Sequence, residues 1–225
     1  MGSSTRPANT GAQDLRVVVV DDHDVFRRGL VRLLREEGVD VIGEASGGHA
    51  AVRLAEELRP DVVVMDLNMP DLAGVDATRR IASGDSGARI VMLSVSGSET
   101  DMVNALVAGA VGYVGKDETL ERILAVLRAA ADGDTVIPPR VGGEIMRRLR
   151  AQPGQADDDG PADLSERELE VLRLIVEGQD NASIASTLII SPHTVKNHVA
   201  SIFDKLGVAN RLQASVQALR RGLAS

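Results

Sequence analysis

The sequence predicts an α/β domain with a doubly wound, five-stranded parallel sheet, followed by a small all-α domain of four short helices. Three observations carry this prediction. Short β-branched runs alternate with helical patterns over the first 130 residues, polar residues directly follow several of these runs, and no strand pattern remains after Asp163. The length of 225 residues fits two domains, and the 44% apolar content suffices for packed cores.

Five segments have the character of strands. Residues 17–20, 62–65 and 90–93 are continuous apolar runs, as expected where helices cover both faces of a parallel sheet. Residues 39–45 and 111–114 are weaker runs of the same kind. Together they supply the five strands of the predicted sheet.

Helical patterns separate these strands. Apolar residues recur at helical spacing in 25–35, 50–58, 102–108 and 120–130. We expect Asp24 to be the N-cap of the first helix, since Asp at a strand end often has that role. Alternating strands and helices indicate five β-α units, which form a doubly wound sheet.

Composition shifts divide the chain. We expect a disordered tail at 1–13, a first domain at 14–132, a linker at 133–162 with one short helix at 141–149, and a second domain at 163–225. The tail lacks the apolar segment of a signal peptide, and no apolar run approaches the ~18 residues that cross a bilayer. The absence of Cys excludes disulfides, thiolate zinc sites and a Cys nucleophile. These features predict a cytoplasmic protein without a membrane partner.

Capping signals define the C-terminal helices. Ser165 and Glu168 form a capping box, and Ser191-Pro192 is a typical helix start with Pro at the first helical position. The predicted helices are one from 165 to Gly178, one at 181–188, one from Ser191 to Gly207, and one at 211–219. Short helices joined by a tight turn suggest a helix-turn-helix.

Polar residues follow the strands at one edge of the sheet. Asp21 and Asp22 follow the first strand, Asp66 the third, Ser94 the fourth, and Lys116 lies just after the fifth. Ligands of open α/β sheets bind at this carboxyl edge. Clustered carboxylates repel one another unless a cation lies among them, and oxygen ligands suit Mg²⁺ or Mn²⁺. With a lysine and a hydroxyl nearby, such a pocket could transfer a phosphoryl group to a carboxylate.

Each of these residues also has an ordinary explanation when taken alone. The pair Asp21-Asp22 could cap a helix, and Lys116 could be a solvated surface lysine. Matching groups at four strand ends favour the functional interpretation.

The motifs resemble a known family. Residues 17–22, 66–71 with Gly74, Ser94, and 109–116 are similar to the receiver domain of bacterial response regulators, which has a flavodoxin-like fold. The resemblance covers about residues 14–132.

The resemblance implies a phosphoacceptor site. Asp66 would accept a phosphoryl group from a sensor histidine kinase, and Lys116 would pair with it. Mg²⁺, or alternatively Mn²⁺, would be held by Asp21, Asp22, Asp66 and the backbone carbonyl of Asn68. The protein would then catalyse only its own phosphorylation and dephosphorylation, and would not otherwise be an enzyme.

Two further residues would act as a switch in this family. Ser94 would bond to the phosphate and move inward, and Tyr113 would follow it. Plain core packing is the alternative for Tyr113, but its place three residues before Lys116 favours the switch role.

The C-terminal residues resemble a second family. The stretches 164–172, 181–185, 190–198 and 205–208, with Arg211, are similar to the LuxR-type domain of NarL/FixJ regulators. The helix at 192–206 would be the recognition helix in the DNA major groove. Its core face would be formed by Val195, Val199, Ile202, Phe203 and Leu206.

The predicted DNA-binding residues lie mainly on the opposite face. Lys196, Asn197 and Ala200 would face the groove, where Lys and Asn can bond to base edges. The residues expected to contact DNA phosphates are Thr194, His198, Asn181 and Ser183. Lys205 and Arg211 complete the set of predicted DNA-binding residues. His198 could equally be an ordinary surface residue. Ala200 and Ala182 replace basic residues of other members, which indicates that binding depends on a dimer.

We therefore predict a two-component response regulator that controls transcription. Its partners would be a sensor histidine kinase, double-stranded DNA and, when phosphorylated, a second copy of itself. RNA polymerase is a further possible partner. The last helix, about 209–219, would form the dimer, with half-sites roughly 10 bp apart. The resemblance also suggests an inactive state in which the receiver covers the recognition helix.

Three alternatives remain at this stage. The carboxylates could serve a Mg²⁺-dependent phosphotransferase or phosphatase, although position 68 is Asn where an Asp-x-Asp pair would need Asp. The protein could bind DNA independently of phosphorylation, or its C-terminal helices could bind protein. Charge favours DNA: residues 181–225 carry five basic residues against one acidic residue, although the whole chain has a net charge of −8.

Overall fold

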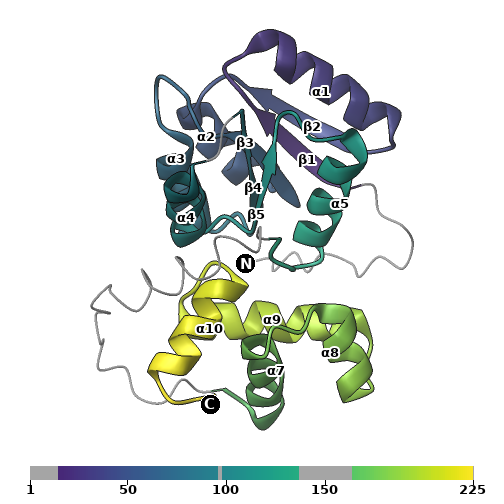
Figure 1. The fold of residues 1–225 in the computed structure, drawn as a ribbon, viewed down its shortest axis with the longest axis vertical. Coiled ribbons are helices and arrows are strands. Elements are labelled where there is room, and N and C mark those ends of the chain that lie inside the picture. Colours follow the sequence, from purple (N-terminus) through teal and green to yellow (C-terminus); the bar gives the residue numbers. More distant parts are fainter. Residues whose placement is uncertain (1–14, 96–97, 137–163, 225) are drawn as a thin grey trace, which may run out of the picture.

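The computed structural model describes residues 15–95, 98–136 and 164–224, which form an α/β domain and a helical domain (Figure 1). The strands of the first domain are β1 (Arg16–Val20), β2 (Asp40–Ala45), β3 (Val62–Asp66), β4 (Arg89–Ser94) and β5 (Gly112–Gly115). They form one parallel sheet in the order β2-β1-β3-β4-β5, which confirms the predicted fold class.

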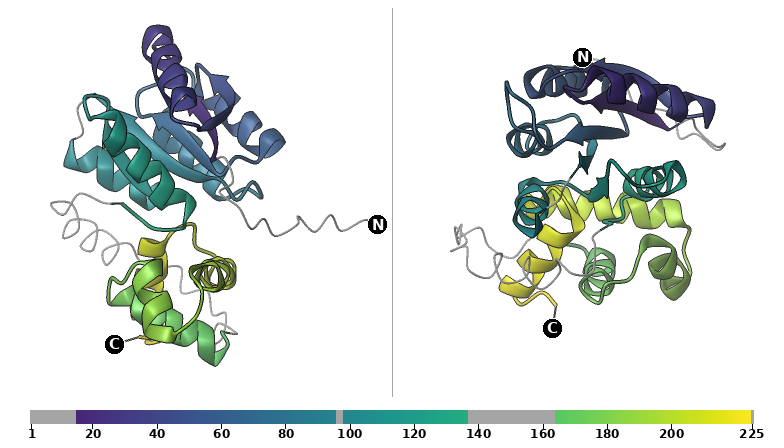
Figure 2. Two further views of the ribbon diagram at one scale, coloured as in Figure 1. Left: turned by 90° about the vertical axis from the view of Figure 1, so that its right-hand side faces the viewer. Right: turned by 45° about the horizontal axis from the view of Figure 1, so that its top comes forward.

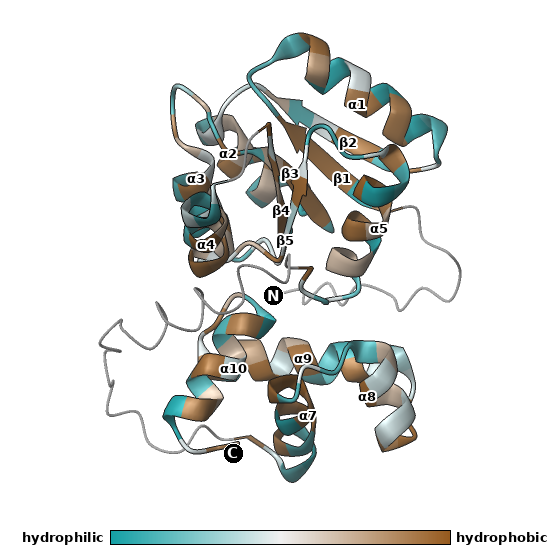
Figure 3. Cartoon of the chain, in the orientation of Figure 1, coloured by the Kyte–Doolittle hydropathy of each residue, from teal (hydrophilic) through white to brown (hydrophobic). Residues whose placement is uncertain are grey.

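Five helices flank this sheet on both sides. They are α1 (Asp24–Glu36), α2 (Gly48–Leu58), α3 (Gly74–Ala82), α4 (Glu99–Ala108) and α5 (Leu120–Ala131). Side chains alternate along each strand, so Val17 and Val19 belong to the apolar cluster that includes α1 and α5, whereas Val18 and Val20 belong to the one that includes α2, α3 and α4. Coloured by hydropathy, the strands are mostly brown and the helices carry teal on their outer faces (Figure 3). This burial on both faces explains why the strand sequences are continuously apolar.

The helical domain has its own core. It consists of α7 (Glu166–Val176), α8 (Asn181–Leu188), α9 (Pro192–Leu206) and α10 (Arg211–Arg220). Ser165 and Glu168 form the predicted capping box, and Gly207 ends α9 in the left-handed region at φ 64°. The buried side chains of α9 are the five predicted ones, which leaves the opposite face of the helix free for another role.

Two predictions about local structure differ from the fold. Helix α3 was not among the predicted helices, because it is only nine residues long and its buried residues include small or polar ones such as Ala77 and Thr78. The N-cap of α1 is His23, with no side-chain cap bond, and Asp24 is the first helical residue. The prediction that Asp24 caps α1 was therefore wrong: its carboxylate instead accepts a bond from Arg27, 2.5 Å away. The predicted tail at 1–13 and helix at 141–149 lie outside the described residues.

The two domains are in contact at the amino ends of the strands, opposite the predicted pocket (Figures 1 and 2). Side chains of α10 join the apolar cluster of the first domain, with Val216 buried and Leu212 partly buried against it. Across the same boundary, the Arg89 guanidinium lies 5.5 Å from the centre of the Phe203 ring. Among the described residues, no helix is long and apolar enough to span a bilayer.

Candidate functional site

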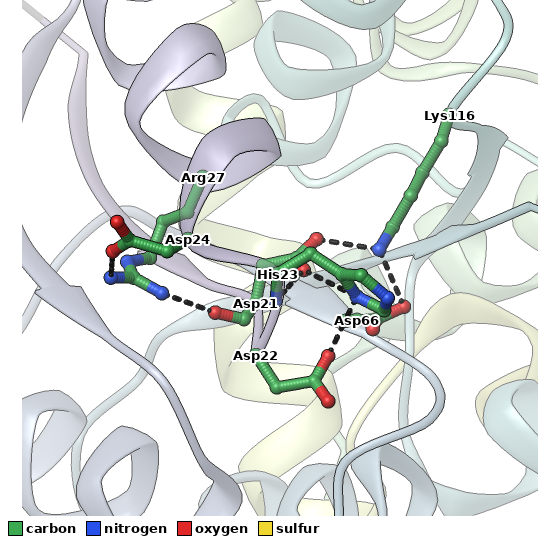
Figure 4. A network of polar contacts seen from close by, with 7 residues as sticks. All are labelled: Asp21, Asp22, His23, Asp24, Arg27, Asp66 and Lys116. Atoms are coloured by element: carbon green, nitrogen blue, oxygen red, sulfur yellow. Dashed lines mark hydrogen bonds and ion pairs between the residues drawn. The ribbon is translucent and has the colours of Figure 1, made fainter.

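The carboxylates that follow β1 and end β3 lie together. These strands are neighbours, with Val20 paired to Met65, so Asp21 and Asp66 come next to each other at the carboxyl edge. Asp21 is fully buried and Asp66 is 3% exposed, whereas the Asp22 side chain is 29% exposed. The predicted convergence of three carboxylates is therefore present (Figure 4).

Lys116 enters the same pocket from the end of β5. Its Nζ lies 2.6 Å from Oδ2 of Asp21 and 3.1 Å from Oδ1 of Asp66, and its side chain is only 7% exposed. The lysine also lies 4.9 Å from the centre of the Phe26 ring. Lys116 is therefore a buried member of the pocket rather than a solvated surface lysine.

The charges in this pocket do not balance. Three carboxylates and one ammonium group leave two negative charges in excess. Burial raises the pKa of Asp66, and the neighbouring charge of Asp21 adds to this, although Lys116 opposes both. The ionised form of Asp66 is thus disfavoured by its surroundings, which is the electrostatic condition that a divalent cation would relieve.

The donor atoms suit a divalent cation. One donor atom each of Asp21, Asp22, His23 and Asp66 lies within 4.8 Å of the others. Oδ1 of Asp22 is shielded from solvent. Carboxylate oxygens of this kind are the ligands that Mg²⁺ and Mn²⁺ prefer. Asn68, whose backbone carbonyl was the fourth predicted ligand, lies exposed two residues beyond Asp66.

His23 was not a predicted site residue. It directly follows Asp22, and its Nδ1 lies 2.9 Å from Oδ1 of Asp22 and 3.4 Å from Oδ1 of Asp21. The only signal in the sequence was this adjacency, which is weak because a single His beside carboxylates is common.

Ser94 and Tyr113 lie on the neighbouring strands. Ser94 ends β4 and is 2% exposed, and its Oγ has no hydrogen-bond partner among the described residues. Its backbone carbonyl accepts a bond from the Lys116 N–H at 2.8 Å, which ties the serine to the pocket lysine. Tyr113 pairs with Met92 in the sheet and is buried in the cluster that includes α4.

Gly74 allows the close approach of α3 to the pocket. A Cβ on this residue would lie 2.2 Å from the backbone carbonyl of Asp66. No side chain fits there without displacing the backbone of the site, which explains the glycine at the start of α3.

The residues predicted to contact DNA lie on α8, α9 and α10. Asn197 and Ala200 of α9 and Ser183 of α8 are exposed, whereas Thr194 and His198 are half-buried. The exposed residues lie opposite the buried face of α9, as the helical spacing predicts.

Lys196 and Asn181 are bound to the first domain instead of facing solvent. Nζ of Lys196 donates to the carbonyl of Ala131, 2.5 Å away, at the end of α5. Asn181 is 4% exposed, and its side-chain amide donates to the carbonyl of Asp132 at 2.7 Å. Its backbone N–H donates to the Asp134 carboxylate at 3.2 Å.

The two remaining residues are held within the protein as well. Arg211 is 9% exposed and bonds to Asn181 and Asp134. Lys205 bonds to both carboxylate oxygens of Glu168. Burial alone would raise the pKa of Glu168, but the bonds from Lys205, Ser201 and Ser165 lower it to about 2. Because this pKa is lowered by folding, the interaction stabilises the domain near neutral pH and is lost as the pH falls towards 2.

Comparison with known proteins agrees with this geometry. Residues 17–128 match the response regulator receiver domain, and residues 162–218 match the bacterial regulatory proteins of the LuxR family. The transcriptional regulatory protein LiaR of Bacillus subtilis is 39% identical, with 93% of this chain and 99% of that protein covered.

Two other relatives give the same result. The nitrate/nitrite response regulator NarP of Escherichia coli is 37% identical, with 93% of this chain and 97% of NarP covered. A crystal structure of a LuxR-family response regulator from Aurantimonas has a TM-score of 0.53 and 36% identity, with 61% of this chain and 98% of that chain covered. The chain therefore belongs to the two-component response regulators that join a receiver domain to a LuxR-type DNA-binding domain and regulate transcription.

Proposed function

We propose that Asp66 is the residue that receives the phosphoryl group, and that a sensor histidine kinase donates it. A carboxylate oxygen of Asp66 forms a bond to phosphorus while the P–N bond of the kinase phosphohistidine breaks. The leaving electron pair stays on the imidazole nitrogen of the kinase. Water later hydrolyses the acyl phosphate, so the protein turns over no substrate other than its own phosphoryl group.

The single observation that best supports this proposal is the set of groups around Asp66. Lys116 lies 3.1 Å away and can pair with a phosphoryl oxygen, and the buried hydroxyl of Ser94 has no partner among the described residues and can donate to another. A Mg²⁺ ion, or Mn²⁺ in its place, would neutralise the phosphoryl oxygens, held by Asp21, Asp22, Asp66 and the backbone carbonyl of Asn68. Tyr113 would follow Ser94 when the hydroxyl turns to the phosphate.

Phosphate incorporation tests this assignment. Wild-type protein incubated with labelled acetyl phosphate and Mg²⁺ should acquire a label that is stable in acid and lost in base, and Asp66→Asn should acquire none. Labelling that survives in Asp66→Asn would exclude Asp66 as the acceptor. Asp76→Asn, on the exposed part of α3, is the matched control and should label normally.

We also propose that the contact between the domains is an inhibited state. Lys196 and Asn181, both predicted to bind DNA, are occupied by the backbone carbonyls of Ala131 and Asp132. Those carbonyls lie at the C-terminal end of α5, where the helix dipole is negative. The end of α5 thus offers the same chemistry as a DNA phosphate, and the DNA cannot reach these side chains while the contact persists.

The start of α10 is held in the same contact. Asn210 is fully buried, and its amide donates to the carbonyls of Leu106 and Ala110 at 3.0 and 3.1 Å. The amide of Gln213 donates to the carbonyl of Val107 at 3.0 Å. Because α10 is the helix predicted to form the dimer on DNA, the end of α4 restrains that helix as well.

Phosphorylation would then shift the equilibrium towards separated domains. The domains would correspond to residues 14–132 and 163–225, joined by 133–162. The released α9 would place Lys196, Asn197 and Ala200 in the major groove, with Thr194, His198, Asn181, Ser183, Lys205 and Arg211 near the phosphates. A dimer through α10 would bind two half-sites about 10 bp apart and could contact RNA polymerase. Its kinase and its DNA place this activity in the cytoplasm.

DNA-binding assays test this part of the proposal. The phosphoryl mimic beryllofluoride should raise the affinity of the wild-type protein for its operator, and should leave that of Asp66→Asn unchanged. Equal affinity with and without the mimic would show that DNA binding is independent of phosphorylation. The affinity should also fall steeply with salt concentration, since phosphate contacts release counterions.

A further inference from the structure

The imidazole of His23 lies among the carboxylates of the pocket. Its Nδ1 is 2.9 Å from Oδ1 of Asp22, and its donor atom belongs to the group within 4.8 Å that includes Asp21 and Asp66. Ligands around an octahedral Mg²⁺ or Mn²⁺ at about 2.1 Å would lie roughly 3 to 4.2 Å apart. The spacing of these four side chains is close to that range before any ion enters. In Figure 4 the His23 ring lies beside the carboxylates of Asp22 and Asp66.

The backbone holds His23 in this position. It is the N-cap residue of α1, with extended angles, and its side chain is not used for capping. Its backbone N–H donates to Oδ1 of Asp21 at 2.8 Å, which ties the residue to the most deeply buried carboxylate. The ring itself is 68% exposed, so it can rotate towards an ion without disturbing the core.

We propose that His23 is a nitrogen ligand of the divalent cation and makes the site select Mn²⁺ over Mg²⁺. This inference rests on the proposed function, since it assigns a further ligand to the same metal site. Carboxylate and carbonyl oxygens serve both ions, but an imidazole nitrogen is a poor match for the harder Mg²⁺, which takes oxygen ligands. A site of three carboxylates alone would lack this preference.

Charge supports a neutral ligand at this position. The three carboxylates and Lys116 leave two negative charges, which one divalent ion balances. A neutral imidazole adds a donor atom without disturbing that balance, whereas a fourth carboxylate would leave the site negative again. Oδ1 of Asp22 is shielded from solvent and lies 2.9 Å from Nδ1 of His23, so both atoms are already directed at the same point. Asp22 and His23 can therefore approach the same ion from the exposed side of the pocket.

Calorimetric titration of the full-length, untagged protein with MgCl₂ and with MnCl₂ tests the proposal. His23→Ala should weaken Mn²⁺ binding by roughly tenfold and Mg²⁺ binding by less than about twofold. His49→Ala removes an exposed imidazole at the start of α2 and is the matched control, which should change neither affinity. Proportional losses for both ions, or no loss for Mn²⁺, would overturn the assignment.

A spectroscopic signature separates ligation from a general structural effect. Pulsed electron paramagnetic resonance of the Mn²⁺-bound wild-type protein should show coupling to an imidazole nitrogen. The coupling should disappear in His23→Ala and persist in His49→Ala. Coupling that is absent from the wild type, or that remains in His23→Ala, contradicts the proposal.

The Asp66→Asn variant distinguishes a failure of the proposed function from a failure of the role assigned to His23. It should weaken both ions, because Asp66 belongs to the site whichever ion is bound. If neither ion binds in an Asp66-dependent way, the proposed metal-assisted phosphorylation itself is wrong. If both ions require Asp66 but their affinity ratio is unchanged in His23→Ala, only the role of His23 is wrong.

Discussion

The two ends of the receiver sheet differ in how their polar groups are satisfied. At the carboxyl ends of the strands, the carboxylates outnumber Lys116, and the Ser94 hydroxyl has no partner among the described residues. At the opposite end, the donors of Lys196, Asn181 and Asn210 all meet backbone carbonyls of the receiver.

The carboxylate pocket has the charges for a ligand but no group among the described residues that balances them. At the domain interface, backbone carbonyls of the receiver already occupy the donors. The negative charges of the pocket outnumber its positive charge. A cation and a phosphoryl group would therefore bind there with little competition from groups of the protein. The proposed DNA-reading residues Lys196 and Asn181 are hydrogen-bonded to the receiver while the domains are in contact, so under the proposal DNA would have to displace the receiver. Changes in the pocket should therefore affect chemistry, and changes in the interface should affect the equilibrium between the two domain arrangements.

The largest effect is expected from a substitution of Lys116 in the carboxylate pocket. Lys116→Ala removes the cation that lies 3.1 Å from Asp66, and should slow phosphate incorporation by about 100-fold or more. The rate of labelling from acetyl phosphate measures this. Lys196→Ala, at the other end of the molecule, should label at the wild-type rate. A near-normal rate in Lys116→Ala would mean that the pocket does not depend on this charge.

The next largest effect is expected at the interface between the domains, from a substitution of Asn210. Asn210→Asp keeps an oxygen for the cap of α10 but places negative charge against the carbonyls of Leu106 and Ala110. The domain contact should weaken, and DNA affinity of the unphosphorylated protein should rise about tenfold. Fluorescence anisotropy with operator DNA measures the change. The phosphorylated variant should bind like phosphorylated wild type, and unaltered affinity before phosphorylation would contradict the inhibited state.

A smaller effect is expected on the stability of the metal-free receiver. The pKa of Asp66 is raised, so its ionisation opposes folding, and stability should fall as the pH rises above the ordinary value of 3.8. Asp66→Asn should remove this loss and raise the free energy of unfolding at neutral pH. Thermal unfolding without divalent ions measures it. Asp22→Asn, at a more exposed carboxylate, should gain less, and a destabilised Asp66→Asn would refute the argument.

The smallest effect concerns strain in the helical domain. Ile189 ends α8 in the left-handed region at φ 54°, although it is β-branched, and its side chain is 91% exposed. Ile189→Asn should relieve the strain without loss of packing and stabilise the domain by ~0.5 kcal/mol. Ile189→Val keeps the branch and should change little. Chemical denaturation would show whether the two variants differ, and a destabilised Ile189→Asn would argue for an unrecognised contact.

The pocket could be predicted from the sequence because its signals are local. Asp21 and Asp66 each directly follow an apolar run, and parallel strands bring their carboxyl ends to one edge. The register of β1 and β3 then sets the two carboxylates side by side. The same is true of α9, whose buried face follows from helical spacing alone.

The remaining features could not be predicted in this way. Helix α3 is only nine residues long and buries Gly74, Ala77 and Thr78 beside Ile81, so few large apolar residues recur at helical spacing. His23 is a single histidine whose relation to Asp66 exists only in the folded sheet. The contact of Asn210 with Leu106 joins residues 104 positions apart, and no local pattern specifies such a pair.

The contact between the domains forms within one chain. It therefore needs a lower binding affinity than a contact between separate proteins would need. The described parts of the two domains are joined through 27 residues, 137–163. Joining two binding partners in one chain can give effective concentrations on the order of millimolar. A contact that would be too weak to detect between separate proteins can therefore keep most molecules closed. A coupling free energy of about 1–3 kcal/mol, typical of allosteric proteins, would then suffice to open them.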